Sequence, residues 1–99
     1  MKKGGAAYIL TNKTHTVLYT GVTSDLKLRL HQHKTKENPK SFTAKYKVYK
    51  LVYFKSFHNI NDAITKEKRI KDGNREKKIE LIESINPNWN ELQFELDIL

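Results

Sequence analysis

The N-terminal part of the chain contains two short runs in which β-branched, aromatic and other apolar residues dominate. They cover residues 6–11 (AAYILT) and 16–22 (TVLYTGV), and a polar segment, residues 12–15, separates them. Two β-rich runs joined by a short polar turn predict an antiparallel hairpin. If the turn is centred on its middle bond, Tyr8 lies directly opposite Tyr19, and both phenols share one sheet face. Such a pair can line a site or simply pack.

A basic helix is predicted directly after this hairpin. Residues 23–25 (TSD) supply candidate N-caps, and Leu26 and Leu30 stand one helical turn apart as an apolar stripe. Arg29 and His33 fall at the border of that stripe, one turn apart from each other. This border position makes them candidates for a site. Taken alone, the stretch is explained better by an arginine that reaches solvent and a histidine that hydrogen-bonds within the fold.

The rest of the pattern predicts a third strand and two more helices. A short helical turn is expected at residues 41–45, and residues 48–57 read as a strand that is apolar on both faces and therefore covered on both sides. Helices are predicted over residues 59–71 and 75–85, while the alternation at residues 92–98 fits either a strand or an irregular helix. The residues expected on the inner helix faces are Ala63, Ile64 and Ile70, then Ile79, Leu81, Ile82 and Ile85.

Glu67 stands in the middle of the predicted inner face of the helix over residues 59–71. A carboxylate on an apolar stripe is costly to desolvate unless a cation or a hydrogen-bond donor meets it. One explanation is an i,i+4 ion pair with Lys71, which is worth only a few tenths of a kcal/mol on exposed helices. Because that compensation is weak, the pattern favours a functional partner for Glu67.

Composition narrows the classes of protein and of partner. The 99 residues suffice for one domain, and the absence of cysteine excludes disulfides and thiolate metal sites. No membrane-spanning segment or secretory signal is predicted, so we expect a cytoplasmic protein. The formal net charge is +8 with a pI near 9.7, which favours a polyanionic partner. The last nine residues contain three acids and no base, so the remaining body carries +11.

Several residues are candidates for contacts with a nucleic-acid backbone. Gly21 lacks a side chain, so a phosphate or another backbone segment can approach it closely, although a bulge is the simpler alternative. On charge grounds Lys27, Lys45 and Lys71 are candidates for phosphate contacts. The alternative is that these lysines form a solvated surface.

The chain resembles the GIY-YIG nuclease superfamily in the order of its motifs. Ala6-Ala7-Tyr8 occupies the position of the first triplet of the family, and Tyr19-Thr20-Gly21 occupies that of the second. Arg29 matches the essential arginine, His33 matches a position that holds His or Tyr, and Glu67 matches the glutamate. Within the superfamily it is most similar to small stand-alone bacterial proteins related to the N-terminal nuclease domain of the UvrC excision-repair protein. The resemblance extends over residues 6–90.

The resemblance implies an α+β fold with a three-stranded antiparallel sheet flanked by helices, in the order β-β-α-β-α-α. A single domain over residues 1–90 would be followed by an acidic tail, residues 91–99. The resemblance further implies one Mg²⁺ or Mn²⁺ ion per site, held by Glu67, with no small-molecule cofactor. Arg29 would bind the scissile phosphate, Tyr8 or Tyr19 would orient or deprotonate the attacking water, and His33 would assist in proton transfer or contact the phosphate.

Three functions compete at this stage. The first is a metal-dependent endonuclease acting on DNA, with RNA as an alternative substrate. The second is a nucleic-acid-binding module that keeps the nuclease fold without catalysis, and the third is a protein-interaction domain. The sequence leaves the oligomeric state, the substrate structure and any sequence specificity open.

Overall fold

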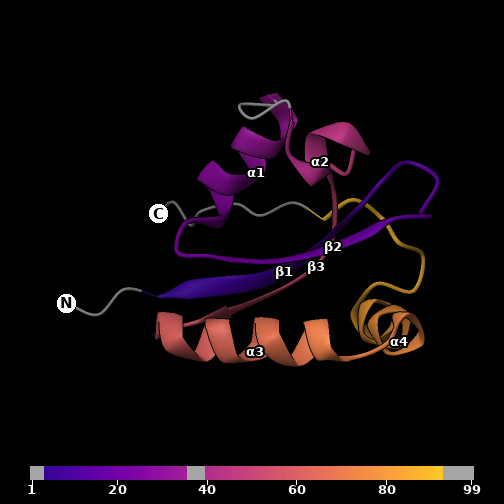
Figure 1. Cartoon of the computed structure of the whole chain (residues 1–99). Helices are drawn as coiled ribbons and strands as arrows, with labels where there is room; N and C mark the ends of the chain where they lie inside the picture. Colours follow the sequence, from indigo (N-terminus) through magenta and orange to yellow (C-terminus); the bar gives the residue numbers. More distant parts are fainter. Residues whose placement is uncertain (1–3, 36–39, 93–99) are drawn as a thin grey trace.

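A three-stranded antiparallel sheet forms the centre of the molecule (Figure 1). The computed structural model describes residues 4–35 and 40–92. The strands are β1 (Gly5–Thr11), β2 (Leu18–Thr23) and β3 (Lys50–Phe57), in the spatial order β2-β1-β3. Because β1 is central and pairs on both edges, β2 has one edge that no described strand covers.

Within the described residues, four helices cover the two faces of the sheet. They are α1 (Leu26–Thr35), α2 (Phe42–Lys45), α3 (Ile60–Asp72) and α4 (Arg75–Ile85). In Figure 1, α1 and α2 lie on one side of the sheet, and α3 and α4 lie on the other. These observations confirm the predicted α+β fold and element order. The side chains that cap the N-termini of α2, α3 and α4 by accepting a backbone N–H are Ser41, Asn59 and Asn74.

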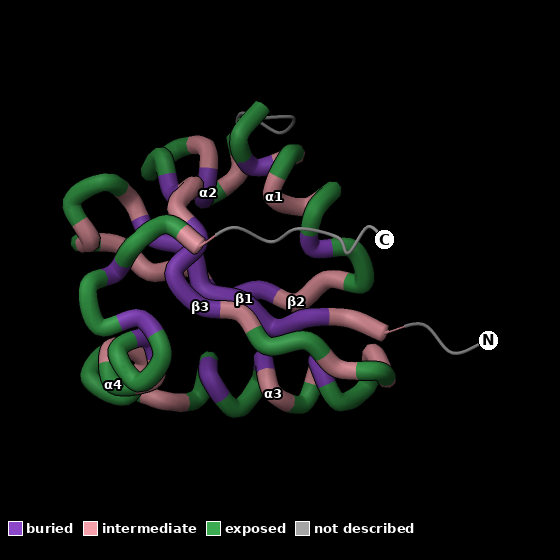
Figure 2. Tube along the Cα trace, turned by 180° about the vertical axis from the view of Figure 1, so that it is seen from behind, coloured by how far each residue is buried: buried purple, intermediate pink, exposed green. Residues whose placement is uncertain are grey.

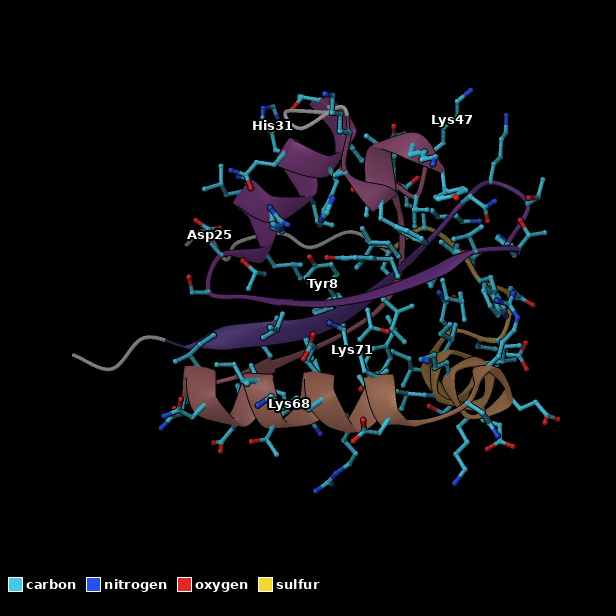
Figure 3. All side chains as sticks on the ribbon, in the orientation of Figure 1. Tyr8, Asp25, His31, Lys47, Lys68 and Lys71 are labelled. Atoms are coloured by element: carbon cyan, nitrogen blue, oxygen red, sulfur yellow. The ribbon has the colours of Figure 1, made fainter. Side chains whose placement is uncertain are left out.

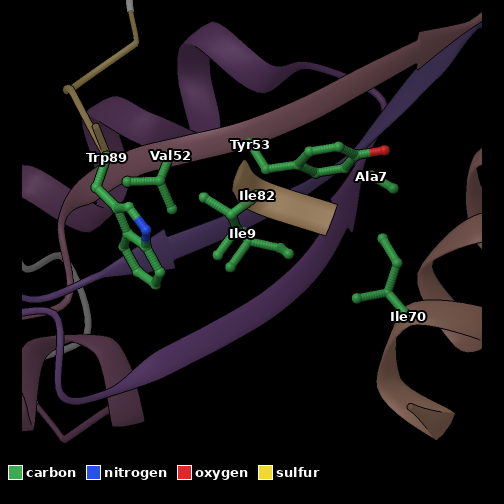
Figure 4. Packing of buried hydrophobic residues seen from close by; sticks show 7 residues of the cluster. All are labelled: Ala7, Ile9, Val52, Tyr53, Ile70, Ile82 and Trp89. Carbon is green, nitrogen blue, oxygen red and sulfur yellow. The ribbon is translucent and has the colours of Figure 1, made fainter. Parts of the chain in front are cut away.

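The sheet separates two apolar clusters, as the two-sided pattern of β3 predicted. Figure 2 shows that buried residues concentrate in the strands and on the side of α3 turned to the sheet. A bulge between Ile9 and Leu10 lets the consecutive residues Val52 and Tyr53 pack on the same side. On the α3–α4 side the buried residues are Ala7, Ile9, Val52, Tyr53, Ile70, Ile82 and Trp89 (Figure 4). On the α1–α2 side they are Ala6, Tyr8, Leu10, Leu26, Val48 and Leu51.

The predicted hairpin register is wrong by two residues. Tyr8 pairs with Gly21 and Leu10 pairs with Tyr19, so the loop is longer than the four-residue turn that was expected. The reason is Asn12, whose side-chain oxygen accepts the backbone N–H groups of residues 16 and 17 at 2.8 and 3.0 Å and so builds a wider loop. A shift of two residues preserves the sheet face, so both phenols still lie on the α1–α2 side.

Some predicted details of packing also differ. Ile85 is 55% exposed rather than inward-facing, because α4 covers the sheet mainly through Ile82 near its middle. Leu92 donates its backbone N–H to the Leu51 carbonyl, while residues 93–98 of the predicted final segment lie outside the described residues. No helix in the described ranges 4–35 and 40–92 is long and apolar enough to cross a membrane.

Candidate functional site

Tyr8 is the buried centre of the candidate site. It lies in β1 with 1% of its surface exposed, and its ring crosses the neighbouring strand directly over Gly21. A Cβ atom built on Gly21 would lie 2.5 Å from both Cζ and the hydroxyl oxygen of Tyr8. A side chain at this position would displace the ring, so Gly21 is required for the Tyr8 phenol to lie across β2. The β1–β2 pairing is regular at Gly21, so the alternative of a bulge there is wrong.

His33 connects Tyr8 to the short helix α2. Its Nε2 lies 3.2 Å from the Tyr8 hydroxyl, and its Nδ1 lies 2.8 Å from Oγ1 of the buried Thr43. The network is satisfied when Tyr8 donates to Nε2 and Nδ1 donates to Thr43. Burial, aided by the charge of Arg29, lowers the pKa of His33 to about 4. The imidazole is therefore neutral at pH 7 and able to accept the phenolic proton.

Arg29 lies beside both phenols. Hydrogen bonding to Tyr8 is the main cause that raises the pKa of Arg29, and hydrogen bonding to Tyr19 contributes. One guanidinium nitrogen also donates to the Gln32 side chain at 3.2 Å, which fixes the arginine along α1. Burial raises the pKa of Tyr8 to about 12, and its hydrogen bond to Arg29 opposes that rise. The guanidinium is thus a fixed positive charge next to two phenol oxygens.

Glu67 is buried on α3 and pairs with Lys71. The carboxylate oxygen lies 2.6 Å from the Lys71 ammonium, and the Glu67 side chain is only 10% exposed whereas that of Lys71 is 56% exposed. Figure 3 shows Lys71 between α3 and the sheet and Tyr8 on the other side of the sheet. The charge of Glu67 still raises the pKa of Tyr8. The ion pair considered from the sequence therefore exists, and the carboxylate acts electrostatically on the cluster.

A groove of about 490 Å³ runs along the open edge of β2. Tyr19 and Phe42 line one side of it, and the cations Lys71, Arg75 and Lys78 line the other. The groove joins the α1–α2 side of the sheet to the α3–α4 side. Of the two phenols, Tyr19 lines this groove, so a charged ligand bound there would lie against Tyr19.

The structure brings most of the predicted site residues together. Tyr8, Tyr19, Arg29 and His33 are in mutual contact, and Glu67 with Lys71 acts on this cluster across the edge of β2. Lys27 and Lys45 are exposed, and Lys45 lies over the Tyr46 ring at 5.6 Å. Sequence reasoning did not give Thr43 a role, because only the tertiary fold brings α2 against His33. The spacing of Arg75 and Lys78, three residues apart on one helix, was a signal that could have found the second wall of the groove.

Comparison with known proteins decides the family. The family model described as the GIY-YIG catalytic domain matches residues 4–80. The chain belongs to the GIY-YIG nuclease family. It is 38% identical over 76 residues to a UPF0213 protein of Oceanobacillus iheyensis, covering 77% of this chain and 86% of that protein. It is also 38% identical over 66 residues to a UPF0213 protein of Haloquadratum walsbyi, covering 67% and 73%.

A solved structure supports the same fold. The solution NMR structure of a UPF0213 protein of Bacillus halodurans aligns with a TM-score of 0.57 and 25% identity, covering 89% of this chain and 92% of that one. The GIY-YIG chain described here is thus similar to small proteins along most of their length. The predicted resemblance to small stand-alone members of the family is confirmed.

The donor set of this GIY-YIG domain limits what metal it can hold. No group of three or more His, Cys, Asp or Glu side chains that could hold an ion occurs within the described parts of the chain. Glu67 is nevertheless a buried carboxylate with an exposed ammonium partner that can move into solvent. Mg²⁺ is commonly bound by one or two carboxylates, waters and substrate phosphates. The residues therefore fit a weakly held Mg²⁺ or Mn²⁺ ion and do not fit a closed protein cage.

Proposed function

We propose that this protein is a Mg²⁺- or Mn²⁺-dependent endonuclease that hydrolyses phosphodiester bonds in DNA. The observation that carries the proposal is that a neutral imidazole and a guanidinium both contact the buried phenol of Tyr8, beside a cationic groove. The GIY-YIG family supports a nucleic-acid substrate. A role in DNA repair, as the resemblance to the UvrC nuclease domain implies, belongs to the same proposal.

Each side chain in the cluster has a role that follows from its contacts. Arg29 holds the scissile phosphate and stabilises the negative charge that grows on its oxygens during attack. Tyr8 cannot be a phenolate at neutral pH, because its pKa is about 12. It therefore accepts the proton of the attacking water while its own proton passes to His33 Nε2, 3.2 Å away. The water oxygen forms a bond to phosphorus as the bond from phosphorus to one ester oxygen breaks. The leaving oxygen takes a proton from solvent, and His33 releases its extra proton to solvent afterwards.

Glu67 would hold the divalent ion, and Lys71 would leave the carboxylate when the ion binds. The bound ion would act as a Lewis acid and withdraw charge from a phosphate oxygen. Lys71 then lies in the groove, where its ammonium is free to contact a phosphate. Gly21, Lys27 and Lys45 remain candidates for further contacts with the nucleic acid.

A non-catalytic nucleic-acid-binding module is the alternative, and the ion pair of Glu67 with Lys71 is the observation that favours it. In that case Glu67 serves only to neutralise Lys71 beside the sheet. The basic groove then binds DNA without cleaving it.

Incubation with a panel of DNA structures tests the proposal. Purified protein is mixed with nicked, branched, single-stranded and duplex DNA in Mg²⁺, in Mn²⁺ and in EDTA. The proposal is supported if the wild type cleaves DNA only with a divalent ion. Cleavage should also fall at least 100-fold in Arg29→Lys, because lysine cannot reproduce the bidentate contact of arginine with a phosphate. Arg69→Lys, on the exposed face of α3, is the matched control. Binding without cleavage of any substrate would favour the alternative.

A further inference from the structure

A row of aromatic rings leads from the buried Tyr8 to the protein surface. The Tyr8 and Tyr19 ring centroids are 6.4 Å apart, and Tyr19 stacks on Phe42 at 6.0 Å with an angle of 27° between the rings. Tyr46 follows Phe42 at 4.8 Å. The row therefore begins at the candidate catalytic phenol and ends on α2 and the residue after it.

The outer rings of this row are unusually exposed. Phe42 and Tyr46 are each 46% exposed. Single exposed apolar side chains, such as Leu28 on α1 and Ile85 on α4, are ordinary on protein surfaces. Phe42 and Tyr46 are different, because the two exposed rings are adjacent and Phe42 also lines the groove, so together they offer an apolar surface that a flat ligand can cover.

The opposite side of the groove carries positive charges that can contact the phosphates of a nucleotide. Lys71, Arg75 and Lys78 place three cations across from Tyr19 and Phe42. Proteins that bind single-stranded nucleic acid combine such a cationic path for phosphates with aromatic faces for bases. The groove volume of about 490 Å³ falls within the range of about 300–1,000 Å³ typical of small-ligand sites, which is enough for a nucleotide.

We propose that this groove binds unpaired nucleotides of a DNA strand, with a base stacked on Phe42 and the backbone held by Arg75 and Lys78, which Lys71 joins when a divalent ion releases it from Glu67. A base inside a duplex has both faces covered by its neighbours and cannot stack on a protein ring without leaving the helix. The substrate class is therefore DNA that is single-stranded next to the bond to be cut. This inference rests on the proposed function, since it takes Arg29 as the site of the scissile phosphate.

Binding without divalent ions tests the inference separately from cleavage. Fluorescence anisotropy in EDTA compares a labelled single strand with the blunt duplex of the same sequence. A purely electrostatic surface favours the duplex, whose charge density is higher. We expect the wild type to bind the single strand more tightly, and Phe42→Ala to weaken single-strand binding roughly tenfold while changing duplex binding less than twofold.

Two further variants serve as controls for this binding test. Leu28→Ala removes an equally exposed apolar side chain from the outer face of α1 and is expected to leave both affinities unchanged. Phe42→Trp keeps a stacking ring and is expected to retain the single-strand preference, with its fluorescence quenched on binding. Equal affinity of the wild type for both DNA forms, or equal effects of Phe42→Ala on both, would overturn the inference.

Failure of the inference is distinguishable from failure of the proposed function. Suppose that the protein cleaves blunt duplex and single-stranded DNA equally fast, needs a divalent ion, and binds both forms equally well. This result would support the endonuclease and overturn the assignment of the groove to unpaired nucleotides. Selective single-strand binding that is lost in Phe42→Ala, without cleavage of any DNA, supports the groove assignment and contradicts the endonuclease.

Discussion

Burial keeps both Tyr8 and His33 in the neutral state. Burial raises the pKa of the phenol to about 12 and lowers that of the imidazole to about 4, so neither group is charged between these limits. The hydrogen bond between them is therefore ready to transfer a proton, yet it costs no buried charge in the resting protein. This pairing explains how a histidine can lie on the inner side of a basic helix.

The lowered pKa of His33 predicts how stability depends on pH. The unfolded chain binds a proton near the ordinary pKa of 6.5, whereas the folded chain resists protonation down to about 4. The free energy of unfolding should therefore fall as the pH drops from 6.5 to 4, by an amount on the order of 2 kcal/mol. Urea denaturation at several pH values, on the wild type and His33→Gln, isolates this contribution. Parallel losses in both proteins would show that other groups cause the dependence.

Replacement of Gly21 should displace Tyr8. In Gly21→Ala the new Cβ would meet the phenol at 2.5 Å, and the ring is packed within a core strand. We expect a destabilisation of about 1–3 kcal/mol and a large loss of any cleavage activity. Gly73→Ala is the matched control, since its Cβ would make ordinary contacts at 3.4 Å. A stable Gly21→Ala protein with the wild-type cleavage rate would refute the role given to this glycine.

At the scale of elements, the four-residue helix α2 has two separate roles. Its N-cap Ser41 accepts the Ala44 N–H at 3.2 Å, which fixes the turn and directs Thr43 inward toward His33. The same turn leaves Phe42 exposed at the groove. A change of the Thr43 side chain can therefore alter the orientation of His33 while Phe42 keeps its contact with Tyr19 of β2.

Thr43→Val tests the positioning of His33 by α2. Valine keeps the shape of threonine but leaves His33 Nδ1 without its partner, so we expect a destabilisation of about 1–3 kcal/mol. The ring also loses the contact that selects its tautomer, and cleavage should slow at a saturating substrate concentration while DNA binding is unchanged. Thr65→Val on the exposed face of α3 serves as the control. Unchanged cleavage in Thr43→Val would remove Thr43 from the site.

The sequence predicts each element well where periodicity alone determines it. Residues 48–57 are apolar on both faces of the predicted strand and so required cover on both sides, and the structure has helices on both sides. The hairpin register failed because the side chain of Asn12 reshapes the loop, which no strand pattern encodes. Arg29 and Glu67 stood out because each breaks an apolar pattern. Thr43 did not, because its role exists only after α2 packs on α1.

At the scale of the whole molecule, the excess of bases predicts weak, salt-sensitive binding to DNA. The affinity should fall steeply between 50 and 200 mM salt and vary little with sequence, as for any surface that mainly contacts phosphates. Neutralising Glu91, Glu95 and Asp97 as amides raises the formal net charge from +8 to +11. Substitution is preferable to truncation because Leu92 packs on the core. Binding of this triple variant should be tighter at low salt, and an unchanged affinity would show that these acids do not compete for the groove.

The direct measurement of the central claim is DNA cleavage in Mg²⁺ by the wild type and Glu67→Gln, with thermal melts of both. The amide keeps the shape of the carboxylate, and the exposed Lys71 can hydrate, so the variant should lose less than about 1 kcal/mol of stability. Glu80→Gln on α4 is the exposed control. The account predicts a folded Glu67→Gln protein that binds DNA and cleaves it at least 100-fold more slowly. Cleavage by Glu67→Gln at the wild-type rate, or a low melting temperature that alone explains the lost activity, would contradict it.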